Sequence, residues 1–365
     1  MTTAIHQAFA LGQSIWYDGI RRSLITSGEL EHMVKVEGLR GMTSNPSIFD
    51  AAIAGSSDYT DAIADLRRAG PTDAKSAYEY LAIADIRAAA DIFRPVYDET
   101  AGDDGYISME VSPELAHDTA ATVAEAKRLW GTIDRPNLMV KVPGTEEGIP
   151  AIRELIGAGI NVNVTLLFGL DAYERAAQAY LVGLEDRLAA GAGITDIASV
   201  ASVFVSRLDT ALELHLDRSY AGKVAIANAK GIYAHSHTLF SGERWQALAE
   251  SGARSQRLLW ASTSTKNPEY RDTMYVTDLV APGVVNTMPE PTLHDVADHG
   301  DVRGNTIEGT YDQARALFQQ LAAVGVDYDD VVQVLEDEGV DKFGVSWNQL
   351  LETVKTEMAD SGKAE

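Results

Sequence analysis

The chain of 365 residues contains no cysteine. This absence excludes disulfide-stabilised scaffolds, catalytic thiolates and cysteine-based zinc sites. The chain is also poor in positive charge, since 30 Lys and Arg residues stand against 54 Asp and Glu residues and give a net charge of -24. Such a surface disfavours binding to nucleic acid or to anionic membranes. An anionic ligand would therefore need its own local cationic pocket.

Other features are missing as well. The N-terminus has no basic segment followed by an apolar core, and no run of about eighteen apolar residues occurs, so we expect an unexported, cytoplasmic protein without a membrane span. No phosphate-binding or dinucleotide-binding glycine motif is present, which predicts no nucleotide cofactor. The pairs His235 with His237 and His294 with Asp298 have spacings that a metal could use. Such pairs on surface helices usually bind nothing, so we predict no metal.

One lysine lies inside an apolar run, Pro136-Asn-Leu-Met-Val-Lys-Val-Pro-Gly-Thr145. The β-branched neighbours Val140 and Val142 and the bounding prolines predict a short strand that is buried on both faces. Burial disfavours the ammonium form, so Lys141 would keep some neutral amine near pH 7, and that amine could attack a carbonyl group to form a Schiff base. The alternative is a lysine that extends to the strand end or pairs with a carboxylate.

The segment Met33-Val-Lys-Val36 repeats these letters in a different context. Apolar residues around Lys35 recur at helical spacing, and Glu31 lies four residues earlier, which predicts a solvated ion pair on a helix. We expect Lys35 to stay charged and ordinary. The local letters alone therefore do not identify a reactive lysine.

Short apolar segments alternate with helical ones along most of the chain. The predicted strands cover residues 14–19, 38–46, 106–111, 136–143, 159–168, 197–207, 257–262 and 275–280. The predicted helices cover residues 21–33, 59–97 with a break near 70–73, 115–130, 149–156, 173–190, most of 208–253, and 292 to about 358, where they close the barrel and cover one end. Eight strands alternating with helices predict a parallel (β/α)₈ TIM barrel, as one domain over residues 1–358 followed by a polar tail, 359–365.

In such a barrel the chemistry lies at the carboxyl ends of the strands. Any one polar residue there is more often a satisfied core group or a helix cap than a catalytic group. Seven predicted strands nevertheless end or emerge in polar side chains, which favours a common site. The residues are Asp18, Thr43, Ser44, Asn45, Glu110, Lys141, Asn163, Thr165, Ser202, Arg207 and Ser262.

Two segments, Gly41-Met-Thr-Ser-Asn-Pro-Ser-Ile-Phe49 and Leu138-Met-Val-Lys-Val-Pro-Gly-Thr-Glu-Glu-Gly-Ile149, resemble the signature segments of transaldolases. Asn163 to Phe168 and Ser202 to Arg207 are similar to further family segments, so the resemblance covers Asp18 to Asp278. The chain looks like the longer family type with an extended C-terminal part. The resemblance implies a barrel with its Schiff-base lysine on the fourth strand.

The resemblance also implies a cofactor-free transfer of a dihydroxyacetone unit from a ketose phosphate to an aldose phosphate. In the pentose phosphate pathway this reaction converts sedoheptulose 7-phosphate and glyceraldehyde 3-phosphate into erythrose 4-phosphate and fructose 6-phosphate. Sugar phosphates would be the substrates, and the protein would be a monomer or a homodimer without nucleic-acid or membrane partners.

By the family pattern, Lys141 forms the Schiff base and Asp18 takes the proton of the sugar hydroxyl during carbon–carbon cleavage. Glu110 works through a water as acid and base in carbinolamine formation and loss. Arg207 would grip the phosphate, because a guanidinium offers a bidentate match. The remaining substrate-binding residues implied in this way are Thr43, Ser44, Asn45, Asn163, Thr165, Ser202, Phe204, which would wall the site, and Ser262.

The sequence departs from the family pattern at one point. Many members carry a second phosphate-binding arginine shortly after the seventh strand, but this chain has Ser262-Thr-Ser-Thr-Lys266 there. Lys266 is predicted to replace the arginine, and the alternative is an exposed loop lysine.

Two rival functions remain. A lyase would release free dihydroxyacetone, as the related fructose 6-phosphate aldolases do, but those relatives are shorter and lack the acid at the position of Glu110. A non-catalytic barrel that binds sugar phosphates would be expected to lose the catalytic set, whereas Asp18, Glu110 and Lys141 are all present.

Overall fold

Eight parallel strands close into a barrel in a computed structural model that describes residues 3–70, 72–213 and 215–359. Each strand pairs with the next one along the chain, and the eighth pairs with the first. The predicted (β/α)₈ barrel is therefore confirmed. The strands are β1 (Gln13–Asp18), β2 (Gly41–Thr43), β3 (Ile107–Glu110), β4 (Leu138–Pro143), β5 (Val162–Leu167), β6 (Ser199–Phe204), β7 (Arg257–Ala261) and β8 (Val284–Met288).

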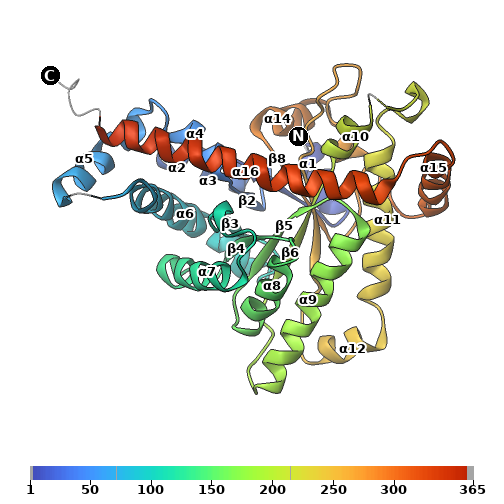
Figure 1. Cartoon of the computed structure of the whole chain (residues 1–365), viewed down its shortest axis with the longest axis horizontal. Coiled ribbons are helices and arrows are strands. Elements are labelled where there is room, and N and C mark those ends of the chain that lie inside the picture. Colours follow the sequence, from blue (N-terminus) through green and yellow to red (C-terminus); the bar gives the residue numbers. More distant parts are fainter. Residues whose placement is uncertain (1–2, 71, 214, 360–365) are drawn as a thin grey trace.

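Helices surround the barrel and extend it on one side (Figure 1). Those of the first half are α1 (Ala4–Ala10), α2 (Arg22–Thr26), α3 (Glu29–His32), α4 (Pro46–Ile53), α5 (Thr60–Ala69), α6 (Ala74–Glu99), α7 (Thr119–Ile133) and α8 (Gly148–Gly157). Those of the second half are α9 (Leu170–Ala189), α10 (Ser206–Leu212), α11 (Val224–Leu239), α12 (Glu243–Glu250), α13 (Met274–Thr277), α14 (Glu290–His299), α15 (Tyr311–Ala323) and α16 (Tyr328–Ala359). None of the described helices combines the length and the apolar character needed to cross a membrane.

The strands are buried on both faces, as expected where helices cover a parallel sheet from outside and side chains fill the barrel. Every residue of β4, β5 and β6 is buried. The register brings Glu110 of β3 beside Lys141 of β4, and Lys141 beside Asn163 of β5. Three of the predicted polar residues are thus neighbours in three adjacent strands.

The predicted eighth strand is wrong. Residues 275–280 include the end of the one-turn helix α13, and the true β8 begins at Val284. The closing strand must start level with β1, and its register pairs Gln13 with Val284 directly after the backbone bond from Gly283 to Gly12. The β-branched residues around Tyr275 have the composition of a strand, but Tyr275 belongs to α13, and its hydroxyl donates a hydrogen bond to Asp209.

Several predicted boundaries also differ from the structure. Gly28, with a φ of 83°, separates α2 from α3 inside the predicted helix 21–33. The second strand is only Gly41–Thr43, because Asn45 caps α4 by accepting a hydrogen bond from the Ile48 amide and Pro46 begins that helix. The sixth strand ends at Phe204, so Arg207 belongs to α10.

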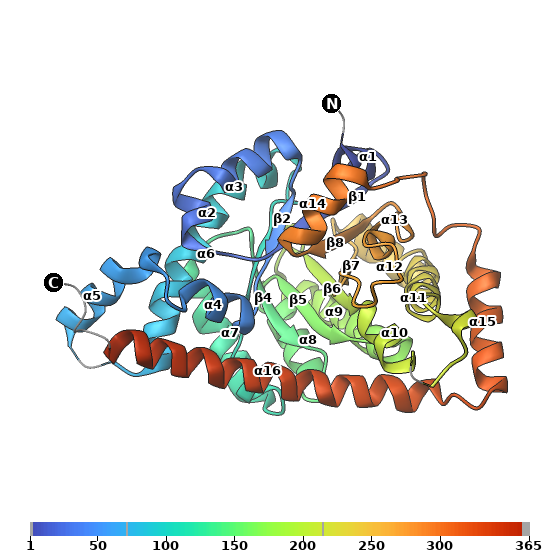
Figure 2. The same ribbon diagram turned by 90° about the horizontal axis from the view of Figure 1, so that it is seen from above.

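The last helix, α16, runs across the molecule from α15 to α5 in both views (Figures 1 and 2). At its start the Tyr328 hydroxyl bonds to Asn228 of α11. Near its end Thr353 bonds to Asp50 of α4, and the Met358 carbonyl accepts from Arg67 of α5. These contacts hold α16 over the barrel. The predicted polar tail lies outside the described residues except for Ala359, which ends α16.

Candidate active site

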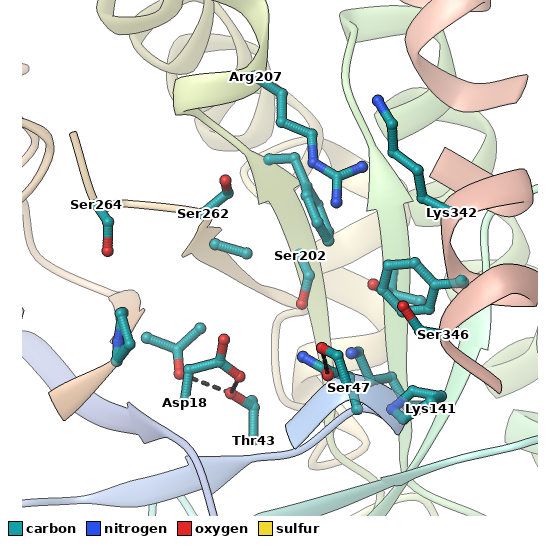
Figure 3. A pocket seen from close by; sticks show the side chains of 18 of the residues that line it. Asp18, Thr43, Ser47, Lys141, Ser202, Arg207, Ser262, Ser264, Lys342 and Ser346 are labelled. Atoms are coloured by element: carbon teal, nitrogen blue, oxygen red, sulfur yellow. Dashed lines mark hydrogen bonds between the residues drawn. The ribbon is translucent and has the colours of Figure 1, made fainter. Parts of the chain in front are cut away.

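A cavity of about 310 Å³ opens at the carboxyl ends of the strands, beneath α16. Figure 3 shows Lys141 and Asp18 toward one end and Arg207 and Lys342 at the other. The residues that line the cavity are Asp18, Thr43, Asn45, Pro46, Ser47, Lys141, Thr165, Ser202, Phe204, Arg207, Leu259, Ala261, Ser262, Ser264, Lys266, Thr287, Pro289, Lys342, Phe343 and Ser346.

Lys141 is buried where β4 meets the cavity. Its Nζ lies 3.4 Å from Oε2 of Glu110 and 3.3 Å from the carbonyl oxygen of Ser44, and its side chain is 7% exposed. Lys35, whose neighbours repeat the same letters, pairs with Glu31 on the surface and has a side chain that is 65% exposed, as predicted. Lys141 does pair with a carboxylate, as its alternative interpretation proposed, but it also faces a cavity that holds a second acid.

Burial raises the pKa of Glu110 from its ordinary value to about 7, although the neighbouring Lys141 opposes the shift. Glu110 does not line the cavity itself, but it contacts Lys141, which does. Tyr78 interacts electrostatically with Glu110 and stacks edge to face on Phe49 and Trp347. A carboxyl group with such a pKa can give and take a proton near neutral pH.

Asp18 ends β1 and has a different environment from Glu110. Its Oδ1 accepts a hydrogen bond of 2.7 Å from Oγ1 of Thr43, which is in turn 2.7 Å from Oγ1 of Thr287. Burial raises the pKa of Asp18, while Lys141 and the Thr43 hydroxyl both oppose the shift. Thr287 was missed by the sequence analysis because β8 was placed too early.

The wall between Lys141 and the far end is built by β5 and β6. Asn163 donates to Oγ of Ser108 at 3.0 Å and accepts from Oγ of Ser202 at 2.6 Å, so it lies behind Ser202 and fixes that hydroxyl. Thr165 lines the cavity, and its buried Oγ1 has no hydrogen-bond partner among the described residues. A register shift follows in β5, where Leu166 adopts a φ of 62°. This bulge ends the regular strand just beyond Thr165.

The far end of the cavity is cationic. The Arg207 guanidinium lies 5.1 Å from the centre of the Phe204 ring, and its buried Nη1 has no hydrogen-bond partner among the described residues. Ser262, which has a φ of 54°, lies near this end, with its Oγ 2.9 Å from that of Ser206. Lys266 and Lys342 also line the cavity. These groups can bind an anion.

The comparison with known protein families agrees with this geometry. Residues 15–354 match the family model described as transaldolase/fructose-6-phosphate aldolase. The chain belongs to this family. Among its curated relatives, Transaldolase 1 of Streptomyces avermitilis is 51% identical over 358 residues, which cover 96% of this chain and 94% of the relative. Transaldolase of Frankia alni is 48% identical over 99% of both chains, and Transaldolase of Thermobifida fusca is 48% identical over 98% of this chain and 99% of the relative.

Most residues that the transaldolase resemblance singled out meet at this one cavity, and their roles stay predictions. Ser44 and Asn163 do not line it: the Ser44 hydroxyl turns away to the Ser108 carbonyl, and only its own carbonyl contacts Lys141. The lining residues that the sequence analysis missed include Ser47, Ser264, Thr287, Lys342, Phe343 and Ser346. Ser47 and Ser264 lie within segments that resemble or depart from the family pattern, whereas nothing in the sequence marks the three residues of α16.

A metal-like grouping lies elsewhere in the described residues. One ligand atom each from Asp272, Asp295 and His299 lie within 4.8 Å of one another. The ring of His299 is 3.0 Å from Asp272 and 3.2 Å from Asp298. Hydrogen bonds to Asp272 and Asp298 raise the pKa of His299, which favours ion pairing of its imidazole with these carboxylates. Neither histidine pair that was considered from the sequence belongs to this grouping. His235 pairs with Glu174, and Asp298 pairs with His299.

Proposed function

We propose that this protein is a transaldolase that moves a dihydroxyacetone unit through a Schiff base on Lys141. Its reaction would convert sedoheptulose 7-phosphate and glyceraldehyde 3-phosphate into erythrose 4-phosphate and fructose 6-phosphate. The observation that carries this proposal is the buried pair of Lys141 and Glu110, which opens into a cavity with Asp18 nearby and the Arg207 guanidinium at the far end. A ketose phosphate has the matching layout, with a carbonyl near one end and a dianion at the other.

In the first step the Lys141 amine attacks the ketose carbonyl and forms a carbinolamine, which must then lose water. Glu110 supplies the proton for the departing hydroxyl through a bridging water. Its pKa of about 7 supports this role, because a carboxyl group that is half protonated near neutral pH can both donate the proton and take it back.

In the second step Asp18 takes the proton of the C4 hydroxyl, the C3–C4 bond breaks, and its electron pair moves into the iminium group to leave an enamine. The aldose phosphate departs, and the enamine attacks the aldehyde of the acceptor by the reverse of the same steps. The hydrogen bond from Thr43 supports this role, since it fixes the orientation of the Asp18 carboxylate in the cavity. The two acids lie in different strands and have different partners, which suits opposite proton-transfer roles.

The substrate hydroxyls would be bound by the polar lining between these two ends. Thr43, Asn45, Thr165 and Ser202 offer hydroxyl or amide groups there. Oγ1 of Thr165 has no partner among the residues that the structure describes, which supports its role, because a buried polar atom without a partner costs free energy unless a ligand satisfies it. Ser44 and Asn163 would support Lys141 and Ser202 from behind, and Ser262 would join Arg207 and Lys266 at the phosphate.

Borohydride trapping tests the proposal. Fructose 6-phosphate and borohydride should leave a dihydroxyacetone-sized adduct on the peptide that contains Lys141 in the wild type. The adduct should be absent in Lys141→Ala and present in Lys35→Ala, which removes the surface lysine with the same neighbours. A folded protein that binds the sugar without any adduct would favour the non-catalytic barrel.

The acceptor distinguishes transferase from lyase. With erythrose 4-phosphate present, a transaldolase converts fructose 6-phosphate to sedoheptulose 7-phosphate at a rate that far exceeds the release of free dihydroxyacetone. Equal release with and without the acceptor would identify a lyase of the fructose-6-phosphate aldolase kind. We propose the cytoplasm as the compartment, since the charged substrates are made and consumed there. The proposed steps require no added cofactor.

A further inference from the structure

The end of the cavity opposite Lys141 brings together cations from two distant parts of the chain. Arg207 begins α10 after β6, whereas Lys342 belongs to the C-terminal helix α16. Figure 3 shows both side chains reaching the same end of the cavity, away from Lys141 and Asp18. Two like charges at one place favour a counterion or an anionic ligand between them.

Glu338 is the counterion of Lys342. Nζ of Lys342 donates to its Oε2 at 2.6 Å, one helical turn away. Lys342 most strongly, and Arg207 in addition, lower the pKa of Glu338. The side chains of Lys342 and Glu338 are 59% and 52% exposed, and exposed pairs of this kind contribute little to stability. A stronger anion can therefore take the place of the carboxylate.

One nitrogen of the Arg207 guanidinium is unsatisfied within the described part of the chain. Its Nη1 is buried without a hydrogen-bond acceptor among the described residues, and burial lowers its pKa while Glu338 opposes that shift. An unsatisfied buried donor is costly, and a phosphate group supplies several strong acceptor oxygens. A phosphate bound by Arg207 and Lys342 would supply the acceptor that Nη1 of Arg207 requires.

The helix that carries Lys342 is fixed against the cavity wall on both sides of this residue. One turn before it, Gly339 packs so closely that an added Cβ would lie 3.1 Å from Cδ2 of Leu166. About one turn after it, the buried Trp347 ring packs edge to face on Tyr78 at 5.3 Å. The backbone of Lys342 therefore has a fixed position, and only its flexible stem must move to exchange Glu338 for a ligand.

We propose that Lys342 is a phosphate-binding cation of this protein in addition to Arg207 and Lys266, and that the substrate phosphate displaces the Glu338 carboxylate from Lys342. This inference rests on the proposed function and adds the C-terminal helix to its substrate specificity. Lys266 lines the same cavity, but Glu338 links Lys342, and not Lys266, to Arg207 within the described part of the chain. The proposal therefore gives Lys342 a larger share of phosphate binding than Lys266.

Full-length Lys342→Met tests the proposal against two donors, fructose 6-phosphate and unphosphorylated fructose, with erythrose 4-phosphate as acceptor. We expect kcat/KM for fructose 6-phosphate to fall about 10- to 100-fold, mainly through KM, because one charge-assisted contact is lost. The value for fructose should stay the same. Lys355→Met, which removes an exposed lysine of the same helix that pairs with Glu352, should change neither value.

Glu338→Gln provides a test of opposite sign. It removes the competing carboxylate but keeps the length of the side chain, so KM for fructose 6-phosphate should fall while KM for fructose stays constant. Inorganic phosphate gives a readout that does not depend on the reaction: its binding, measured by calorimetry, should weaken in Lys342→Met and strengthen in Glu338→Gln.

Three results would overturn the proposal: an unchanged KM for fructose 6-phosphate in Lys342→Met, equal losses with both donors, or a phosphate-specific loss in Lys266→Met alone. The proposed function is judged separately, by the borohydride adduct on Lys141. If the wild type forms that adduct and Lys342→Met binds phosphate normally, only this inference fails. If no adduct forms, the function fails, and the calorimetric result still decides whether Lys342 binds phosphate.

Discussion

The Nζ of Lys141 lies 3.4 Å from Oε2 of Glu110, and only 7% of each side chain is exposed. The two residues face each other across the register of β3 and β4. Burial raises the pKa of Glu110 to about 7, so the carboxyl group changes its protonation state in the pH range where the amine must react. The register of two neighbouring strands thus places a carboxyl group that can donate a proton beside the amine that we propose as the nucleophile.

Glu110→Gln should slow Schiff-base formation by about 100-fold or more, the usual contribution of a positioned general acid. As the pH rises through about 7, the wild type loses the proton of Glu110, so dehydration of the carbinolamine should slow on the alkaline side. The glutamine does not ionise, and this decline should vanish. Rapid-quench borohydride trapping from pH 5 to 9 measures both effects.

Glu114→Gln, at an exposed position in the turn after β3, is the matched control and should keep the wild-type profile. A profile for Glu110→Gln that retains the alkaline decline would show that another group controls this step.

Asp18→Asn should separate the two halves of the reaction. Lys141 and Glu110 are left intact, so the Schiff base with fructose 6-phosphate should still form, but the C4 hydroxyl loses its base and turnover should fall about 10²- to 10⁴-fold. Mass mapping after borohydride should then find the whole six-carbon sugar phosphate on the Lys141 peptide in place of the three-carbon fragment. Asp61→Asn, on the exposed face of α5, should give the three-carbon adduct. A three-carbon adduct formed by Asp18→Asn at the wild-type rate would remove Asp18 from the cleavage step.

The sequence contained enough to locate most of the cavity, because strand ends carry a local signal. Short apolar runs that contain or end in one charged residue marked Asp18, Glu110 and Lys141, and the barrel then requires that the carboxyl ends of such strands converge. The same rule failed for β8, where the β-branched stretch near Tyr275 resembles a strand as closely as Val284–Met288 does. Only the pairing with β1 decides between them, and pairing is a property of the closed barrel.

The contribution of α16 could not be predicted for a different reason. Lys342 and Phe343 lie on an amphipathic helix whose polar and apolar positions look like those of any surface helix. Which of them enters the cavity depends on how the helix crosses the barrel, and Gly339 and Trp347 determine that crossing by their packing on β5 and α6. The residues next to Lys342 in the sequence do not reveal such long-range contacts.

Arg22→Met should destabilise the fold, because it leaves Asp85 buried with one fewer partner. Nε of Arg22 lies 2.7 Å from Oδ1 of Asp85, whose other oxygen accepts from the Tyr59 hydroxyl at 2.8 Å. Breaking one side of a buried pair costs about 3–5 kcal/mol. Burial already raises the pKa of Asp85, against the effect of Arg22, and the loss of Arg22 should raise it further.

The sign of the pH dependence follows from that shift. An acid whose folded pKa is raised contributes stability below its unfolded pKa, and this contribution is lost as the pH rises through the folded pKa. Urea denaturation should therefore find a larger loss for Arg22→Met at pH 8 than at pH 5. The double variant Arg22→Met/Asp85→Leu should recover much of the stability, because no buried charge remains. A double variant as unstable as Arg22→Met would assign the loss to packing of the arginine on Tyr59.

Gly148 of α8 and Gly131 of α7 allow a matched test of how α8 fixes the position of β4, the strand that carries Lys141. A Cβ added to Gly148 would overlap the carbonyl oxygen of Pro143, the last residue of β4, whereas one added to Gly131 of α7 would meet nothing within 4 Å. Gly148→Ala must therefore move α8 or the end of β4, at a cost of about 1–3 kcal/mol. Gly131→Ala should stabilise its helix by about 0.5–1 kcal/mol.

Lys141 lies two residues before Pro143, so the displaced strand should also slow adduct formation in Gly148→Ala, while Gly131→Ala keeps the wild-type rate. Urea denaturation and borohydride trapping on the same samples measure both properties. If Gly148→Ala were as stable and as fast as Gly131→Ala, the close approach of α8 to β4 would not be what fixes the position of the lysine.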